Sequence, residues 1–122
     1  MKKAATIILN RNLPEPTDRL VEHLQKYDLK QTDIFVVEAG SDDDKLSKYC
    51  TWHADSKEIR KVGLRYSRGM NFGLLQLWLD HKWEEYEAFF LLTNDTELSP
   101  QPTVEVMLSL LEDHPRAGII SP

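Results

Sequence analysis

The sequence has little cysteine and no long apolar run, and each shortage excludes a class of protein. Cys50 is the single cysteine among 122 residues, which rules out an internal disulfide and a cysteine-rich metal site. No run approaches the ~18 apolar residues of a membrane-spanning helix. The apolar start at residues 4–9 is too short for a signal peptide. We therefore expect a cytoplasmic protein, although a longer parent protein could associate with a membrane.

The sequence also has fewer basic than acidic residues. The formal net charge is −5, which argues against a nucleic-acid partner because phosphate backbones are met by a basic face. Basic residues do gather between residues 57 and 68, and we interpret them as a solvated strand and loop rather than a polyanion site. The chain is 41% hydrophobic and 29% charged, as expected for one globular domain over residues 1–122.

Short apolar runs alternate with helical patterns along the chain. The apolar runs predict strands buried on both faces at residues 6–9, 34–37 and 88–92. Apolar residues at helical spacing predict helices over residues 16–27, from about 69 to 82, and from Pro102 to His114. This order predicts an α/β fold with a mainly parallel sheet and helices on both faces, in the doubly wound style.

Other segments are less regular. Residues 45–50 are expected to form one or two helical turns, and residues 51–53 and 59–64 to form short strands. A last strand is expected at residues 117–120. Trp78 and Trp83 are expected in the core rather than on a sugar-binding surface, and His53 and His81 are poor candidates for a catalytic base.

Polar residues follow each of the three expected apolar strands, at residues 10–12, 38–42 and 94–97. In doubly wound sheets, ligands bind beyond the carboxyl ends of the strands, so these three clusters should line one edge. Because the edge is acidic where phosphates normally bind, it indicates a divalent cation between protein and ligand.

Four motifs in this order resemble the N-terminal half of family-2 glycosyltransferases, and most closely their rhamnosyltransferase-like members. They are Asn10-Arg11-Asn12, Glu38-Ala39-Gly40-Ser41-Asp42, Asn71-Phe72-Gly73 and Thr93-Asn94-Asp95-Thr96-Glu97. The resemblance covers essentially the whole chain. It implies a Rossmann-like GT-A fold that binds a nucleoside-diphosphate sugar with Mg²⁺ or Mn²⁺.

The resemblance assigns residues to the donor. Glu38 and Asp42 match acids near the base or ribose, and the alternatives are a solvated strand-end carboxylate and a turn residue. Asn10 and Asn12 match small polar residues near the nucleotide, and loop capping is the alternative for both. The remaining matches near the donor are Arg68 facing the diphosphate, Asn71 and Gly73 at the third helix, and Asn94.

The metal position of the family falls on Asp95. Its DxD signature aligns with Thr93-Asn94-Asp95, so only the last acid is present. One carboxylate with diphosphate oxygens and waters can suffice for Mg²⁺. Glu97 could assist through water, or it could simply face solvent.

The family's catalytic base lies in a C-terminal half that would follow residue 122, so we expect no catalytic residue within this chain. That half would also bind the acceptor, a glycan or a lipid or polysaccharide. An exposed sheet edge would favour self-association as a homodimer. Two rival functions remain open: a degenerate non-catalytic nucleotide-binding or scaffold module, and a nucleotidyltransferase of similar fold.

Overall fold

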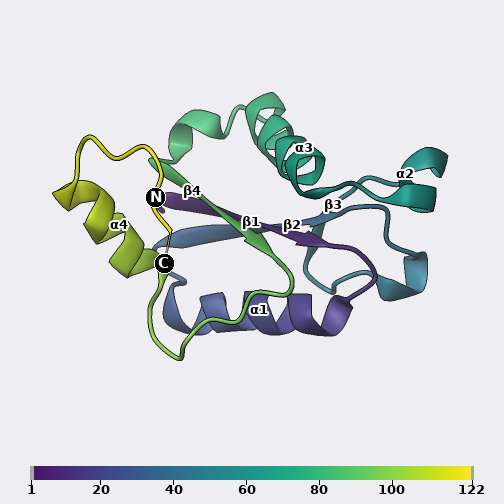
Figure 1. The fold of residues 1–122 in the computed structure, drawn as a ribbon, viewed down its shortest axis with the longest axis horizontal. Helices are drawn as coiled ribbons and strands as arrows, with labels where there is room; N and C mark the ends of the chain where they lie inside the picture. The colour runs from purple at the N-terminus through teal and green to yellow at the C-terminus, as the bar shows by residue number, and fades with distance from the viewer. Residues whose placement is uncertain (1, 122) are drawn as a thin grey trace.

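A four-stranded parallel sheet forms the centre of the computed structural model, which describes residues 2–121 (Figure 1). Its strands are β1 (Ala4–Asn10), β2 (Thr32–Glu38), β3 (Cys50–His53) and β4 (Ala88–Thr93), in the order β3-β2-β1-β4. All three neighbouring pairs are parallel. The predicted α/β class and parallel sheet are confirmed.

Helices cover both faces of this sheet. They are α1 (Pro14–Tyr27), α2 (Lys57–Val62), α3 (Tyr66–Leu79) and α4 (Val104–Asp113), with short 3-10 turns η1 (Asp43–Lys45) and η2 (Trp83–Glu85). Figure 1 shows α1 and α3 on opposite sides of the sheet. Alternate residues of the strands point to opposite faces and form two hydrophobic cores. One core lies between the sheet and helices α1 and α4, and the other lies between the sheet and α3.

The central strand β1 is buried along its whole length, as its apolar run predicts. Ile8 packs toward α1 with Leu24, whereas Ile7 packs toward α3 with Leu77, and all four side chains have no exposed surface. Burying a side chain of this size contributes roughly 1.5–3 kcal/mol. Both faces of β1 therefore hold the sheet between its helices.

The carboxylate of Asp28 fixes the start of α4 from the far end of α1. Asp28 is 1% exposed, and its two oxygens accept hydrogen bonds from the backbone N–H groups of Thr103 (3.0 Å) and Glu105 (3.2 Å). Since the first N–H groups of a helix have no partner within the helix, this contact caps α4 with a residue 75 positions away.

The prediction of a strand at residues 59–64 is wrong, because these residues belong mainly to α2. The Ser56 hydroxyl accepts a hydrogen bond from the Ile59 N–H (3.3 Å) at the start of this helix. Gly63 ends the helix with a φ of 76°. The apolar residues in this segment are too few to distinguish a short helix from a strand, and the capping pair decides the outcome.

The strand expected at residues 117–120 is also not formed. Residues 117–121 run without ladder pairing, and Ile119 is 92% exposed. These residues lie beside the free edge of β4, where a groove of about 800 Å³ separates them from β4 and α4. An extended apolar segment needs hydrogen-bonded neighbours to become a strand, and here it has none.

The two tryptophans expected in the core lie at the surface. Trp78 is 61% exposed and Trp83 is 39% exposed. Trp78 follows Leu77 in α3, and Leu77 takes the position that faces the sheet. Trp83 packs one side of its ring against Phe89, with the ring centres 4.4 Å apart. Within residues 2–121, no helix has the combined length and apolarity needed to cross a bilayer.

Candidate functional site

The sheet register brings three polar loops to one edge. Asn10 is paired with Glu38 at the ends of β1 and β2, and Leu9 is paired with Thr93 at the end of β4. The loops that follow these strands therefore begin at the same level, at the carboxyl edge of the sheet. This is the edge at which sequence reasoning expects a ligand.

Asn10 joins all three loops through its side-chain amide. Its Nδ2 donates to the Glu38 Oε1 at 2.7 Å. Its Oδ1 accepts from the Leu13 N–H (3.0 Å) and from the Asn94 Nδ2 (3.2 Å). A single buried side chain therefore sets the relative position of the loops after β1, β2 and β4.

Glu38 is the buried end of this network. It has no exposed surface, and its carboxylate accepts from the hydroxyl of Ser41 (2.7 Å) and the backbone N–H of Ser47 (2.8 Å) as well as from Asn10. The expectation of a carboxylate that faces the base or ribose is at odds with this placement. Because internal donors surround both oxygens, Glu38 positions the loop at residues 39–47 instead.

Asn12 and Asp42 link the first two loops at the surface. The Asn12 N–H donates to the Ser41 Oγ at 3.1 Å, and the Asn12 Oδ1 accepts from the Asp42 N–H at 2.8 Å. Asn12 has a φ of 59°, a conformation that asparagine tolerates better than most residues. Loop capping therefore describes Asn12, whereas the Asp42 carboxylate is exposed and remains open to a ligand.

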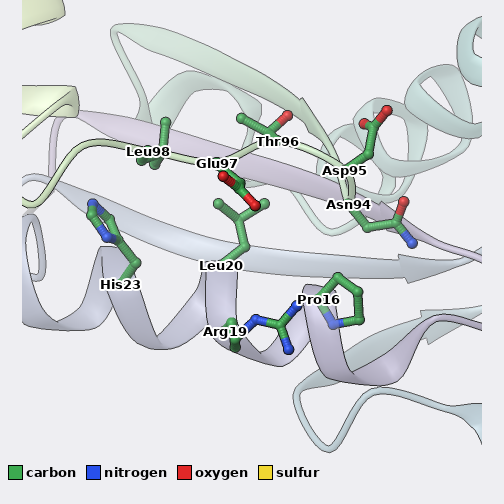
Figure 2. A pocket seen from close by; sticks show the side chains of 9 residues that line it. All are labelled: Pro16, Arg19, Leu20, His23, Asn94, Asp95, Thr96, Glu97 and Leu98. Atoms are coloured by element: carbon green, nitrogen blue, oxygen red, sulfur yellow. The ribbon is translucent and has the colours of Figure 1, made fainter.

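Asp95 stands at the exposed lip of the same edge. Its carboxylate accepts a hydrogen bond from the Thr93 hydroxyl, and Asn94, the residue before it, contacts Asn10. Figure 2 shows the carboxylates of Asp95 and Glu97 directed to different sides of their loop. In residues 2–121, no group of three or more His, Cys, Asp or Glu side chains is arranged to hold a metal ion. Asp95 is therefore an exposed carboxylate at this edge that belongs to no such metal-binding group among these residues.

A cavity of about 410 Å³ opens beside this lip, between α1 and the loop after β4 (Figure 2). It is lined by Pro16, Arg19, Leu20 and His23 on one face of α1 and by Asn94, Asp95, Thr96, Glu97 and Leu98 opposite. Its charged lining residues are Arg19 on α1 and the carboxylates Asp95 and Glu97 on the loop opposite. The His23 Nε2 is buried and has no hydrogen-bond partner within residues 2–121.

The third motif is not brought to the edge. A Cβ on Gly73 would lie 3.0 Å from both Ile7 and Val37, so this glycine lets α3 pack closely over the middle of the sheet. Asn71 and Arg68 are exposed on α3. The structure therefore gives Gly73 a packing role, and it brings neither of the other two into the hydrogen-bonded network of the edge.

Sequence reasoning missed several residues that shape the site. Ser41 and Ser47 donate hydrogen bonds to the buried carboxylate of Glu38. The contact with Ser47 could not be predicted from the local sequence, because Ser47 lies nine residues after Glu38. Arg11 donates to the backbone carbonyl of Val62 at 2.9 Å and so holds the C-terminal end of α2 beside the first loop. Arg19 could have been found, since it stands three residues after Pro16 on one face of a predicted helix.

The chain was compared with protein-family models, with curated proteins and with solved structures, and none of the three comparisons found a match.

Proposed function

We propose that this chain is the donor-binding domain of an inverting glycosyltransferase of the family-2 type, with a GT-A fold. The observation that carries the proposal is the hydrogen-bonded series Asn94–Asn10–Glu38, which joins the loops after β4, β1 and β2 at the carboxyl edge. An exposed carboxylate, Asp95, follows this series directly. Such an edge suits a nucleoside diphosphate that is bound through a cation.

Mg²⁺ or Mn²⁺ would be held by Asp95, with water and diphosphate oxygens as its other ligands. When bound there, such an ion would supply Lewis-acid chemistry by offsetting negative charge on the diphosphate. Arg19 lies across the cavity and can fork onto phosphate oxygens, a geometry that guanidinium groups favour. Glu97 lines the same cavity, and we expect it to meet hydroxyl groups of the ligand rather than the ion.

The chemical step requires more than these residues. An inverting transfer needs a base on the side of the sugar opposite to the leaving group. None of the residues around the network is assigned that role, and we expect both the base and the acceptor site in a longer parent protein. The part assigned to this chain is to bind the donor, orient its diphosphate and offset its charge.

The proposal is tested by titrating UDP-, GDP- and dTDP-sugars with and without Mn²⁺, followed by thermal shift and amide NMR. We expect one nucleotide class to stabilise the chain in a metal-dependent manner and to shift resonances near Asn94. Asp95→Ala should abolish the metal-dependent part. Asp113→Ala, an exposed acid at the end of α4, is the matched control and should respond as wild type does.

The rival functions give different results in the same assay. A nucleotidyltransferase responds to nucleoside triphosphates in preference to nucleotide sugars. A scaffold module responds to no nucleotide. Either pattern, or a response that Asp95→Ala leaves intact, would overturn the proposal.

A further inference from the structure

The outer side of α3 carries a stripe of exposed apolar residues. Leu75 is 50% exposed, Trp78 61% and Leu79 53%, and their spacing of three and four residues places them on one face of the helix. The opposite face packs on the sheet through Met70, Gly73 and Leu77. A helix that is apolar on both sides is normally buried on both sides.

The stripe continues beyond the end of the helix. Trp83 in η2 is 39% exposed and packs against Phe89 from the neighbouring strand. Single exposed apolar residues elsewhere, such as Leu29 in the turn after α1, are ordinary for a protein surface. Two exposed tryptophans and two exposed leucines within residues 75–83 are not ordinary, and groups of exposed apolar residues mark interaction surfaces.

Charges at the two ends of α3 indicate what covers the stripe. Arg65 and Arg68 lie at its N-terminal end, and three acids, Asp80, Glu84 and Glu85, follow its C-terminal end together with one base, Lys82. All six are exposed, and none forms an ion pair within residues 2–121. This order opposes the helix dipole, which favours acids at the N-terminus and bases at the C-terminus. The isolated helix therefore carries its charges in the unfavourable order.

We propose that the outer face of α3 is a dimer interface, against which the same face of a second copy packs in antiparallel orientation. A two-fold axis near Trp78 sets each apolar stripe against its counterpart, as in an isologous contact. The same operation carries Arg68, which lies ten residues or about 15 Å before Trp78, past the C-terminal end of the other helix and toward the acids that follow it. Arg68 lies seven residues before Leu75, which is two turns of helix, and so it shares the face of the stripe.

A second copy accounts for both the exposed apolar stripe and the unpaired charges at the ends of α3. It buries the apolar stripe, and it pairs charges that the monomer arranges against the dipole of α3. The antiparallel packing also aligns the two helix dipoles favourably. An anionic membrane surface would meet Asp80, Glu84 and Glu85 at the end of the stripe and be repelled by them.

The first test measures molecular mass by sedimentation equilibrium over a range of protein concentrations. Wild type should show a monomer–dimer equilibrium, and Leu79→Lys should shift its dissociation constant at least tenfold toward monomer. Leu29→Lys is the matched control, because Leu29 and Leu79 are both 53% exposed and only Leu79 lies in the stripe. A wild type that stays monomeric at ~0.5 mM, or equal effects of the two substitutions, would overturn the proposal.

The second test reverses the charges. Arg65→Glu with Arg68→Glu should weaken the dimer at least tenfold, and Glu84→Lys with Glu85→Lys should do the same. Mixing these two variants should restore association, because each supplies the charge that the other lacks. Circular dichroism checks that both remain folded. Failure of the mixture to associate, with both variants folded, would contradict the antiparallel arrangement.

Discussion

The amide of Asn10 and the carboxylate of Glu38 face each other across two neighbouring strands, 2.7 Å apart and fully buried. No cation approaches this carboxylate closely enough to form an ion pair within residues 2–121. Its charge is instead stabilised by N–H and O–H donors from Asn10, Ser41 and Ser47. Because a buried carboxylate is costly without such donors, the surrounding loops are held in the positions that supply them.

Replacing Glu38 by glutamine should therefore destabilise the protein although the side chain keeps its size. The new amide nitrogen is a donor, and at least one internal donor would lose its acceptor. Leaving a buried polar group unpaired costs about 1–3 kcal/mol in the free energy of unfolding, which urea denaturation would measure. Glu97→Gln is the control, since this exposed carboxylate has no hydrogen-bonded partner within the described residues and should change stability by less than about 0.5 kcal/mol. Equal effects would contradict the positioning role of Glu38.

The strands that build the site could be predicted from sequence because their signal is local. Uninterrupted apolar runs identified β1, β2 and β4, and the parallel order of α/β folds then placed residues 10–12, 38–42 and 94–97 on one edge. The register confirms that shared edge. Residues at strand ends are predictable in this way because parallel strands all present their carboxyl ends at the same edge of the sheet.

What could not be predicted depends on contacts between distant residues. Glu38 looks like any acid after a strand, and its burial becomes visible only when Ser47 folds back over it. The sequence predicts Trp78 in the core, but α3 has apolar residues on both faces, and the sequence does not say which face meets the sheet. Gly73 settles that question, because only a residue without a side chain fits against Ile7 at this distance.

The cap that Asp28 provides for α4 gives a second stability prediction. Asp28→Ala removes the acceptor for the backbone N–H groups of Thr103 and Glu105. Loss of a helix cap costs about 0.5–2 kcal/mol, and the first amides of α4 should exchange faster with solvent. Hydrogen exchange by NMR measures both effects. Asp113→Ala, at the opposite end of the same helix, should leave these amides protected as in wild type, and unchanged protection in Asp28→Ala would disprove the cap.

The phenol of Tyr86 gives a prediction about alkaline pH. Burial, together with the hydrogen bond that its hydroxyl donates to Asp33 at 2.7 Å, raises the pKa of Tyr86 above its ordinary value of 10.0. The unfolded chain therefore releases this proton first as the pH rises. The stability that neutral Tyr86 contributes is complete below pH 10 and is lost progressively above it.

Denaturation curves between pH 8 and 11.5 would measure this dependence. Wild type should lose stability above pH 10 more steeply than Tyr86→Phe, which has no phenolic proton to release. Parallel curves for the two proteins would show that the raised pKa of Tyr86 does not contribute.

Gly40 should be the glycine least tolerant of substitution, because its backbone is left-handed and a Cβ there would meet backbone atoms, whereas at Gly63 it would meet the flexible side chain of Arg11. Its φ of 85° lies in the left-handed region, which costs an alanine about 1–2 kcal/mol. A Cβ at this position would also lie 2.3 Å from the carbonyl oxygen of Ile59. That oxygen belongs to the backbone of α2, and Arg11 holds the end of this helix through the Val62 carbonyl, so it cannot easily move away. Gly40→Ala should therefore lower the free energy of unfolding by at least about 2 kcal/mol.

Gly118 is the matched control for this substitution. A Cβ there meets no atom within 4 Å, and its φ is not in the left-handed region. Gly118→Ala should keep the wild-type stability within about 0.5 kcal/mol. The Arg11→Ala variant separates the two constraints on Gly40: with α2 released, the contact with Ile59 can relax, whereas the backbone strain remains. In that background Gly40→Ala should cost about 1–2 kcal/mol, the backbone part alone. An undiminished cost would show that Arg11 is not what holds α2 against Gly40.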